Sequence, residues 1–140
     1  DGVIKDSVEI KSNAYEDLFL QWGEQVSHKV RDHHRLNGGM SRFDKIPLYL
    51  SWTNESVNEV LINKLCNDFS NLVKYKVINS PWVPGVVELI SHLNYIGNNC
   101  FIVTATPQDE IIEILHELKL HSLFKEVIGS LHSNFLILML

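Results

Sequence analysis

Hydrophobic residues recur at helical spacing through the first half of the chain. The spacing places them on one face of each of several segments, and glycine or proline interrupts the pattern between segments. Such a pattern predicts amphipathic helices that pack their apolar faces together. The expected helices span residues 8–22, 27–36, 41–52 and 56–78. Residues 8–78 are therefore predicted to form an all-helical unit.

Polar residues at the starts of these segments have the form of helix caps. Ser7 and Ser41 each stand directly before an apolar run, where a hydroxyl can accept a hydrogen bond from a free backbone N–H. Ser56-x-x-Glu59 has the spacing of a capping box. We expect three of the helices to begin at these residues.

The pattern changes in the second half of the chain. Residues 79–85 contain two prolines and a glycine and indicate a boundary between domains. A helical run at 86–96 precedes a short apolar run at 100–104 of the kind that buried parallel strands show. A second helix at 109–118 and a second strand at 127–129 follow. This alternation predicts an α/β unit with a parallel sheet.

Composition and charge exclude some partners. The 140 residues are 45% hydrophobic and 21% charged, as in ordinary globular domains, with a formal net charge of -5. A net negative charge opposes sequence-independent binding to nucleic acid and to anionic membranes. No run approaches the roughly 20 apolar residues of a membrane span. Cys66 and Cys100 form no zinc or disulfide pattern, which favours a reduced cytoplasmic setting.

Two short segments carry candidate chemistry. In open α/β sheets, ligands bind beyond the carboxyl ends of strands, where loops converge. Asp1-Gly2-Val3 has an acid at the head of a tight turn, and Thr104-Ala105 follows an apolar strand. The alternatives are structural, since Asp-Gly is a common turn and a β-branched residue such as Thr104 suits a strand end.

These segments resemble two motifs of the haloacid dehalogenase-like hydrolases. Asp1-Gly2-Val3 with Asp6-Ser7 matches the latter part of the family's first motif, and residues 101–104 match the second. Their order, with a helical block between, is similar to the phosphoglycolate phosphatase and β-phosphoglucomutase type. The resemblance implies an incomplete Rossmann-like core, residues 1–7 and 79–140, with an inserted α-helical cap, residues 8–78.

The resemblance also implies a reaction, a Mg²⁺-dependent hydrolysis of a small phosphorylated metabolite. An aspartate two residues before Asp1 would form an aspartyl phosphate, and Asp1 would act as general acid and base. The Thr104 hydroxyl and the Ala105 N–H would hold the phosphate. Mg²⁺ would bind the upstream aspartate, the backbone carbonyl of Asp1 and a downstream acid. A sugar phosphomutase and a catalytically inactive binding or regulatory domain are the alternatives.

Arg42 is the candidate for substrate specificity in the cap. An arginine fork reaching over the active site could grip a second anionic group, whereas a surface arginine near a helix start is the alternative. Acid or base residues in the cap would separate phosphatase from mutase, and the candidates leave that choice open: Lys29, Arg31, His33 and Arg42. The pair His33-His34 is interpreted as part of a solvated helix face.

The chain departs from the family after its second motif. No lysine follows Gly129-Ser130 as the third motif requires, and no acidic fourth motif follows. We therefore expect an inactive partial reading of a longer gene, and the sequence leaves open whether residues from near 131 onward are in frame. Lacking the central strand, it is expected to fold poorly alone. The apolar tail, residues 135–140, is either a buried strand or non-native sequence.

Overall fold

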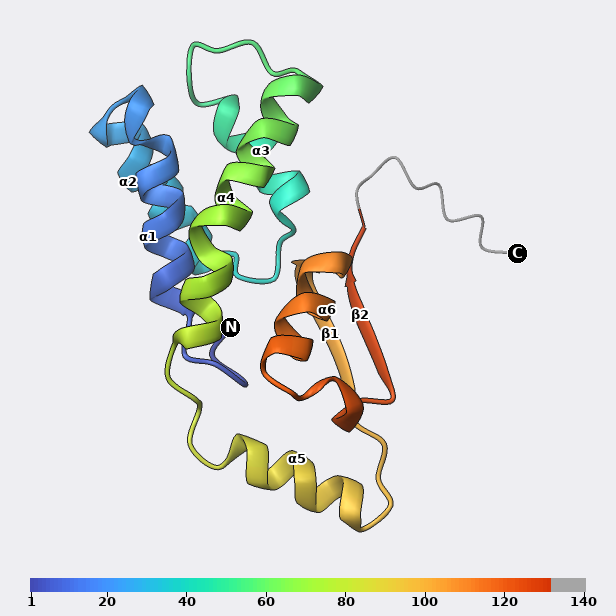
Figure 1. Ribbon diagram of the computed structural model, residues 1–140. Coiled ribbons are helices and arrows are strands. Elements are labelled where there is room, and N and C mark those ends of the chain that lie inside the picture. Colours follow the sequence, from blue (N-terminus) through green and yellow to red (C-terminus); the bar gives the residue numbers. More distant parts are fainter. Residues whose placement is uncertain (132–140) are drawn as a thin grey trace.

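The computed structural model describes residues 1–131 and contains two groups of elements (Figure 1). Four helices of the first half pack together, whereas the second half forms a small sheet with one helix against it and another helix beyond the end of the strands. The predicted apolar tail lies outside the described residues. The helical group comprises α1 (Val8–Phe19), the short 3-10 helix η1 (Leu20–Trp22), α2 (Glu24–Leu36), α3 (Arg42–Leu50) and α4 (Glu59–Asn79).

Aromatic side chains form the centre of the helical group. Tyr15 of α1 stacks on Phe69 of α4 with ring centroids 4.0 Å apart, and it meets Tyr49 of α3 edge-on at 5.5 Å. All three side chains are buried. Burial of large aromatic rings contributes strongly to core stability, so these contacts fix how α1, α3 and α4 pack.

The predicted helix starts are confirmed at one position and revised at two. The Ser41 hydroxyl accepts a hydrogen bond from the Phe43 N–H, as expected of a cap. The predicted capping box is wrong, because Asn58 caps α4 instead by accepting from the Leu61 N–H at 2.9 Å. Ser7 precedes α1 but makes no capping bond.

The second half contains alternating helices and strands in the predicted order. β1 and β2 pair in parallel, with Ile102 opposite Val127 and Val103 opposite Ile128. β1 extends beyond the predicted end at residue 104. The elements are α5 (Val86–Tyr95), β1 (Phe101–Pro107), α6 (Gln108–Glu117), the 3-10 helix η2 (His121–Leu123) and β2 (Glu126–Ser130).

The expected burial of the first strand is wrong for two of its residues. Phe101 is 53% exposed and Val103 is 79% exposed. Within the described residues, β1 pairs only with β2, so these side chains have no neighbouring strand to cover them. The sheet is therefore an open, two-stranded part of an α/β core.

Backbone hydrogen bonds join the start of the chain to the segment before α5. The Asp6 N–H donates to the Pro81 carbonyl at 2.9 Å, and the Val83 N–H donates to the Ile4 carbonyl at 3.0 Å. These bonds hold residues 1–7 beside the second half. The division into a core and a cap at residues 7 and 79 remains a prediction. Among the helices of residues 1–131, none has the length and apolar character that a membrane crossing requires.

Candidate functional site

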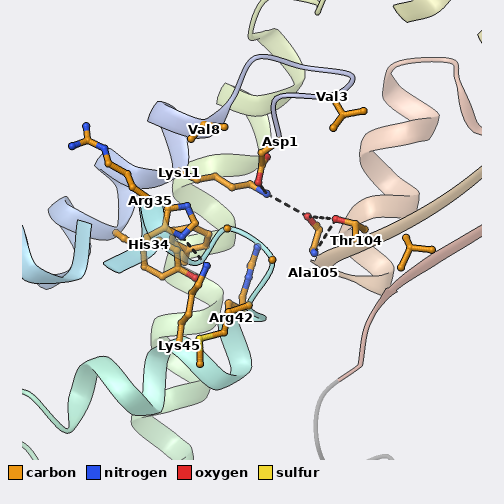
Figure 2. Close-up of a pocket in the computed structure, with 17 residues that line it drawn as sticks. Asp1, Val3, Val8, Lys11, His34, Arg35, Arg42, Lys45, Thr104 and Ala105 are labelled. Carbon is orange, nitrogen blue, oxygen red and sulfur yellow. Dashed lines mark hydrogen bonds and ion pairs between the residues drawn. The ribbon is translucent and has the colours of Figure 1, made fainter. Parts of the chain in front are cut away.

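One cavity brings together the two segments that carry candidate chemistry. Asp1 and residues 103–106 line a cavity of about 430 Å³, together with residues of α1, α2, α3 and α4. Figure 2 shows Lys11 and Arg42 reaching from the helical group toward Thr104 and Ala105 of β1. The volume is within the range of small-molecule sites, about 300–1,000 Å³.

Asp1 is held by donors from two neighbouring residues. The Ser7 hydroxyl donates to Asp1 Oδ1 at 2.8 Å, and the Lys11 ammonium lies 2.9 Å from Asp1 Oδ2. Gly2 turns the chain with φ of 70°, a left-handed conformation that glycine adopts without strain. Both partners are hydrogen-bond donors. This suits an ionised Asp1 side chain, because a carboxylate can only accept hydrogen bonds.

Thr104 lies inside β1, in the stretch where its pairing with β2 becomes irregular. Its hydroxyl accepts a hydrogen bond from the Thr106 N–H at 3.2 Å and lies 3.3 Å from the Thr106 hydroxyl. The Ala105 carbonyl accepts a bond from the Ser130 hydroxyl at 3.0 Å. Irregular pairing commonly re-aims side chains near functional sites.

Lys11 connects the two segments and was not predicted from the sequence. Its ammonium contacts Asp1 and donates to the Thr106 hydroxyl at 3.3 Å, across 95 residues of sequence. Burial and the nearby Arg42 guanidinium lower the pKa of Lys11 to about 8, an effect that Glu110 opposes. Lys11 is therefore mainly charged at neutral pH and supplies a cation between the two motifs.

Arg42 lines the cavity but is fully engaged by an acid of the second half. Its guanidinium donates to the Glu110 carboxylate at 2.7 and 2.9 Å and also bonds the Ser70 hydroxyl. Only 4% of the Arg42 side chain is exposed, so the alternative of a surface arginine is wrong. Its predicted role in specificity remains a prediction.

A second buried lysine lies one helical turn beyond Arg42. Lys45 Nζ is 2.9 Å from His34 Nδ1, and both side chains line the cavity. The interpretation of His33-His34 as a solvated face is wrong for His34, which is 5% exposed. Burial and the charge of Lys45 lower the pKa of His34 to about 3, so its imidazole is neutral.

The other cations considered for the cap lie away from the cavity. The Lys29 ammonium sits over the Trp52 ring, 4.0 Å from its centroid. Arg31 pairs with Glu16 at 2.7 Å and with Asp32 at 3.2 Å. These contacts with their own helical group do not decide between phosphatase and mutase.

The described residues do not by themselves fit a Mg²⁺ site. Asp1 is the one carboxylate that lines the cavity within residues 1–131, and it is already bridged by the Lys11 ammonium. The described part of the chain contains no cluster of three acids, histidines or cysteines that could hold a metal ion. Mg²⁺ is bound octahedrally by oxygen ligands, and a single carboxylate supplies too few of them. The expectation of Mg²⁺ therefore stays a prediction.

Several solved structures are similar to this chain. A protein assigned as a haloacid dehalogenase-like hydrolase from Bacteroides fragilis matches with a TM-score of 0.69 and 15% identity, covering 92% of this chain and 59% of that one. A protein assigned as a beta-phosphoglucomutase from Thermotoga maritima gives 0.60 and 20%, covering 96% and 60%. A hydrolase from Streptococcus pneumoniae gives 0.51 and 19%, covering 96% and 65%.

These likenesses concern the fold, and this chain spans less than two thirds of each matched structure. They confirm the predicted class, an α/β core of the haloacid dehalogenase type, incomplete here, with an α-helical cap. A search of curated proteins gave no significant match. The model of the haloacid dehalogenase-like hydrolase family matches residues 1–135, and the chain therefore belongs to this family of enzymes.

Proposed function

We propose that this protein binds and hydrolyses phosphomonoesters of small metabolites. The observation that carries the proposal is the convergence of Asp1, Lys11 and the Thr104–Thr106 segment on one cavity. Phosphoryl transfer depends mainly on positioning and on positive charge and donors around the transferred group. The Lys11 ammonium supplies positive charge beside Asp1, and the hydroxyls of Thr104 and Thr106 supply hydrogen-bond donors.

The proposed roles follow from the chemistry of each group. The Thr104 hydroxyl and the Ala105 N–H bind the oxygens of the transferred phosphoryl group, and the Lys11 ammonium neutralises part of its charge. Asp1 first supplies a proton to the leaving oxygen, and the carboxylate that results then takes a proton from the attacking water. Its carboxylate form, held by Lys11 and Ser7, suits the proton-accepting step.

The covalent step requires a group that the described residues do not contain. The family resemblance assigns nucleophilic attack to an aspartate two residues before Asp1, with an aspartyl phosphate as the intermediate. Mg²⁺ would neutralise phosphoryl oxygens in such a reaction, but the donors of the described residues do not form a site for it.

A sugar phosphomutase is the second candidate. The cavity has cations on its helical side, Lys45 among them, which favours a substrate with an additional anionic group such as a bisphosphate. Release of inorganic phosphate identifies the phosphatase, whereas isomerisation of a sugar phosphate without phosphate release identifies the mutase. An inactive binding domain would bind phosphate and do neither.

The test is phosphate binding, because it does not depend on the nucleophile. Inorganic phosphate is titrated into the ¹⁵N-labelled intact gene product, and amide shifts are followed by NMR. We expect the largest shifts at residues 104–106. Thr104→Val keeps the β-branched shape and removes the hydroxyl, and it should weaken binding about tenfold, as loss of a charge-assisted hydrogen bond does.

A variant away from the cavity provides the control. Thr53 has a hydroxyl that bonds the Leu50 carbonyl at 2.8 Å outside the cavity, and Thr53→Val should leave phosphate affinity unchanged. Shifts that spread evenly over the protein, or equal affinities for wild type and Thr104→Val, would contradict the proposed site.

A further inference from the structure

Two serine hydroxyls join the helical group to the strand segment that lines the cavity. The Ser41 hydroxyl, at the start of α3, donates to the Ser130 hydroxyl at 3.3 Å, across 89 residues of sequence. The Ser130 hydroxyl, at the end of β2, donates to the Ala105 carbonyl at 3.0 Å. Both serines are half-buried, and neither is among the residues that line the cavity. They could therefore act on a bound ligand only through the segment that contains Ala105.

The direction of these hydrogen bonds follows from the number of protons. A serine hydroxyl has one proton to donate, and its oxygen can also accept. The Ala105 carbonyl uses the Ser130 proton, so the Ser130 oxygen accepts from Ser41. The Ser41 oxygen in turn accepts from the Phe43 N–H at 3.3 Å. The bonds thus run in one direction, from the backbone of α3 to the Ala105 carbonyl, and bonds in such a chain polarise one another.

One peptide unit extends the chain of hydrogen bonds to Thr104. The Ala105 carbonyl and the Thr106 N–H belong to the same planar unit. Its carbonyl accepts from Ser130, and its N–H donates to the Thr104 hydroxyl oxygen at 3.2 Å. The Thr104 proton stays available, because it donates to the Thr106 hydroxyl at 3.3 Å, a long distance for a bond between hydroxyls. A phosphate oxygen in the cavity can replace that weak bond.

The end of β2 is fixed in place beside Ser130. The Gln108 side-chain amide donates to the Val127 carbonyl at 3.0 Å and accepts from the Gly129 N–H at 2.6 Å. Gly129 lies so close to the start of α6 that a Cβ there would be 2.6 Å from Gln108 Cα. This close packing holds the Ser130 hydroxyl against the segment that it contacts.

We infer that Ser130 and Ser41 are positioning residues for phosphate binding, which fix the peptide after Ala105 and so direct the Thr104 hydroxyl toward the ligand. The inference rests on the proposed function and extends it to residues outside the cavity wall. Because Ser41 belongs to the helical group, phosphate affinity then depends on how that group is placed relative to the sheet. The alternative is that Ser130 only stabilises the end of β2, which predicts lower stability without a selective loss of phosphate affinity.

The experiment measures binding of inorganic phosphate to the intact gene product by calorimetry, with circular dichroism to establish that each variant is folded. Ser130→Ala should weaken binding about fivefold, the effect of one neutral hydrogen bond, and should speed hydrogen exchange at the Thr106 amide. Ser130→Thr keeps the hydroxyl and should bind within about twofold of wild type. Ser51→Ala is the control and should leave binding unchanged, because the exposed Ser51 hydroxyl bonds the Leu48 carbonyl at 2.6 Å outside the cavity.

A double variant tests the link to α3. Ser41→Gly removes the hydroxyl at a position where glycine is tolerated as a helix cap, and it should weaken binding about threefold. Because the two serines act in one chain, adding Ser41→Gly to Ser130→Ala should cause less than about twofold further loss. Independent contributions would instead multiply, to about fifteenfold in all.

Each outcome decides between the two proposals. Affinities of wild type and Ser130→Ala that agree within about twofold overturn this inference and leave the proposed function standing. A loss in Ser130→Thr as large as that in Ser130→Ala, an unchanged exchange rate at the Thr106 amide, or losses that multiply in the double variant also overturn it. If phosphate does not bind to the wild-type protein, both the inference and the proposed function are refuted.

Discussion

The buried pair of Arg42 and Glu110 joins the helical group to the second half of the chain, and its loss should destabilise the protein strongly. Arg42 begins α3 and Glu110 lies in α6. Their side chains are 4% and 7% exposed, and two hydrogen bonds of 2.7 and 2.9 Å join them. Glu110→Gln keeps the shape of the side chain and removes its charge, which leaves the guanidinium buried without compensation.

The expected magnitude follows from this burial. Removing one partner of a buried ion pair typically costs about 3–5 kcal/mol. The whole free energy of unfolding of a domain is about 5–15 kcal/mol, so the loss is a large part of it. Asp68→Asn breaks the pair with Lys64, which is as short, 2.6 Å, but has exposed side chains. That change should cost about 0–1 kcal/mol.

Urea denaturation of the intact gene product, followed by circular dichroism, measures both losses. The double change Arg42→Met with Glu110→Leu removes both charges and should recover most of the stability, because an apolar pair needs no compensation. A cost of less than about 1 kcal/mol for Glu110→Gln, the value of an exposed pair, would contradict the expected strength of the buried pair. A double variant no more stable than Glu110→Gln would contradict it as well.

Four further predictions concern the buried lysines and the sheet. Sulfate, which stays a dianion, should bind less tightly as the pH rises through about 8, because the lowered pKa values of Lys11 and Lys45 lie there; calorimetry at several pH values checks this. Between about pH 8 and the ordinary lysine pKa of 10.5, Lys11 and Lys45 hold fewer protons in the folded protein than in the unfolded chain, so their contribution to the unfolding free energy should rise across that window in urea titrations. Burial raises the pKa of the Cys66 thiol from 9.0 to about 11, which partly opposes this rise above pH 9. Lys11→Met should weaken sulfate binding about tenfold in the same calorimetric assay. Gly129→Ala would place a Cβ 2.6 Å from Gln108 Cα and should cost about 1–3 kcal/mol in urea denaturation; Gly39→Ala meets nothing within 4 Å and should change stability by less than about 0.5 kcal/mol.

Helical periodicity and glycine breaks were sufficient to predict the order of elements. The segments differ from their expected bounds by a few residues, because caps depend on which side chain reaches the free N–H groups. Asn58 rather than Ser56 reaches the Leu61 N–H, and a pattern of residue types does not distinguish the two. The extension of β1 to Pro107 and the exposure of Val103 depend on pairing between distant segments, which local pattern does not encode.

Some residues that line the cavity could be predicted from the sequence because they belong to short motifs. Others could not, because their position in the cavity depends on how the helices pack. Asp1 and Thr104 were identified from local motifs, and they line the same cavity. Lys11 and Lys45 were missed because a single lysine in a helix is ordinarily a solvated residue. A signal was present, since Lys11 stands four residues before Tyr15 and so falls on the apolar face of its helix.

The partners of the buried cations separate their roles. Arg42 is compensated by a carboxylate from another element, which is what a structural link between two parts of a protein requires. Lys11 is compensated by Asp1, a group of the candidate site itself, so its charge is available when that carboxylate changes partners or gains a proton. Lys45 faces a neutral imidazole. Because a buried charge without an ionic partner lowers stability, Lys45 should cost the fold more than Lys11 does, and replacing Lys45 with Met should raise the free energy of unfolding.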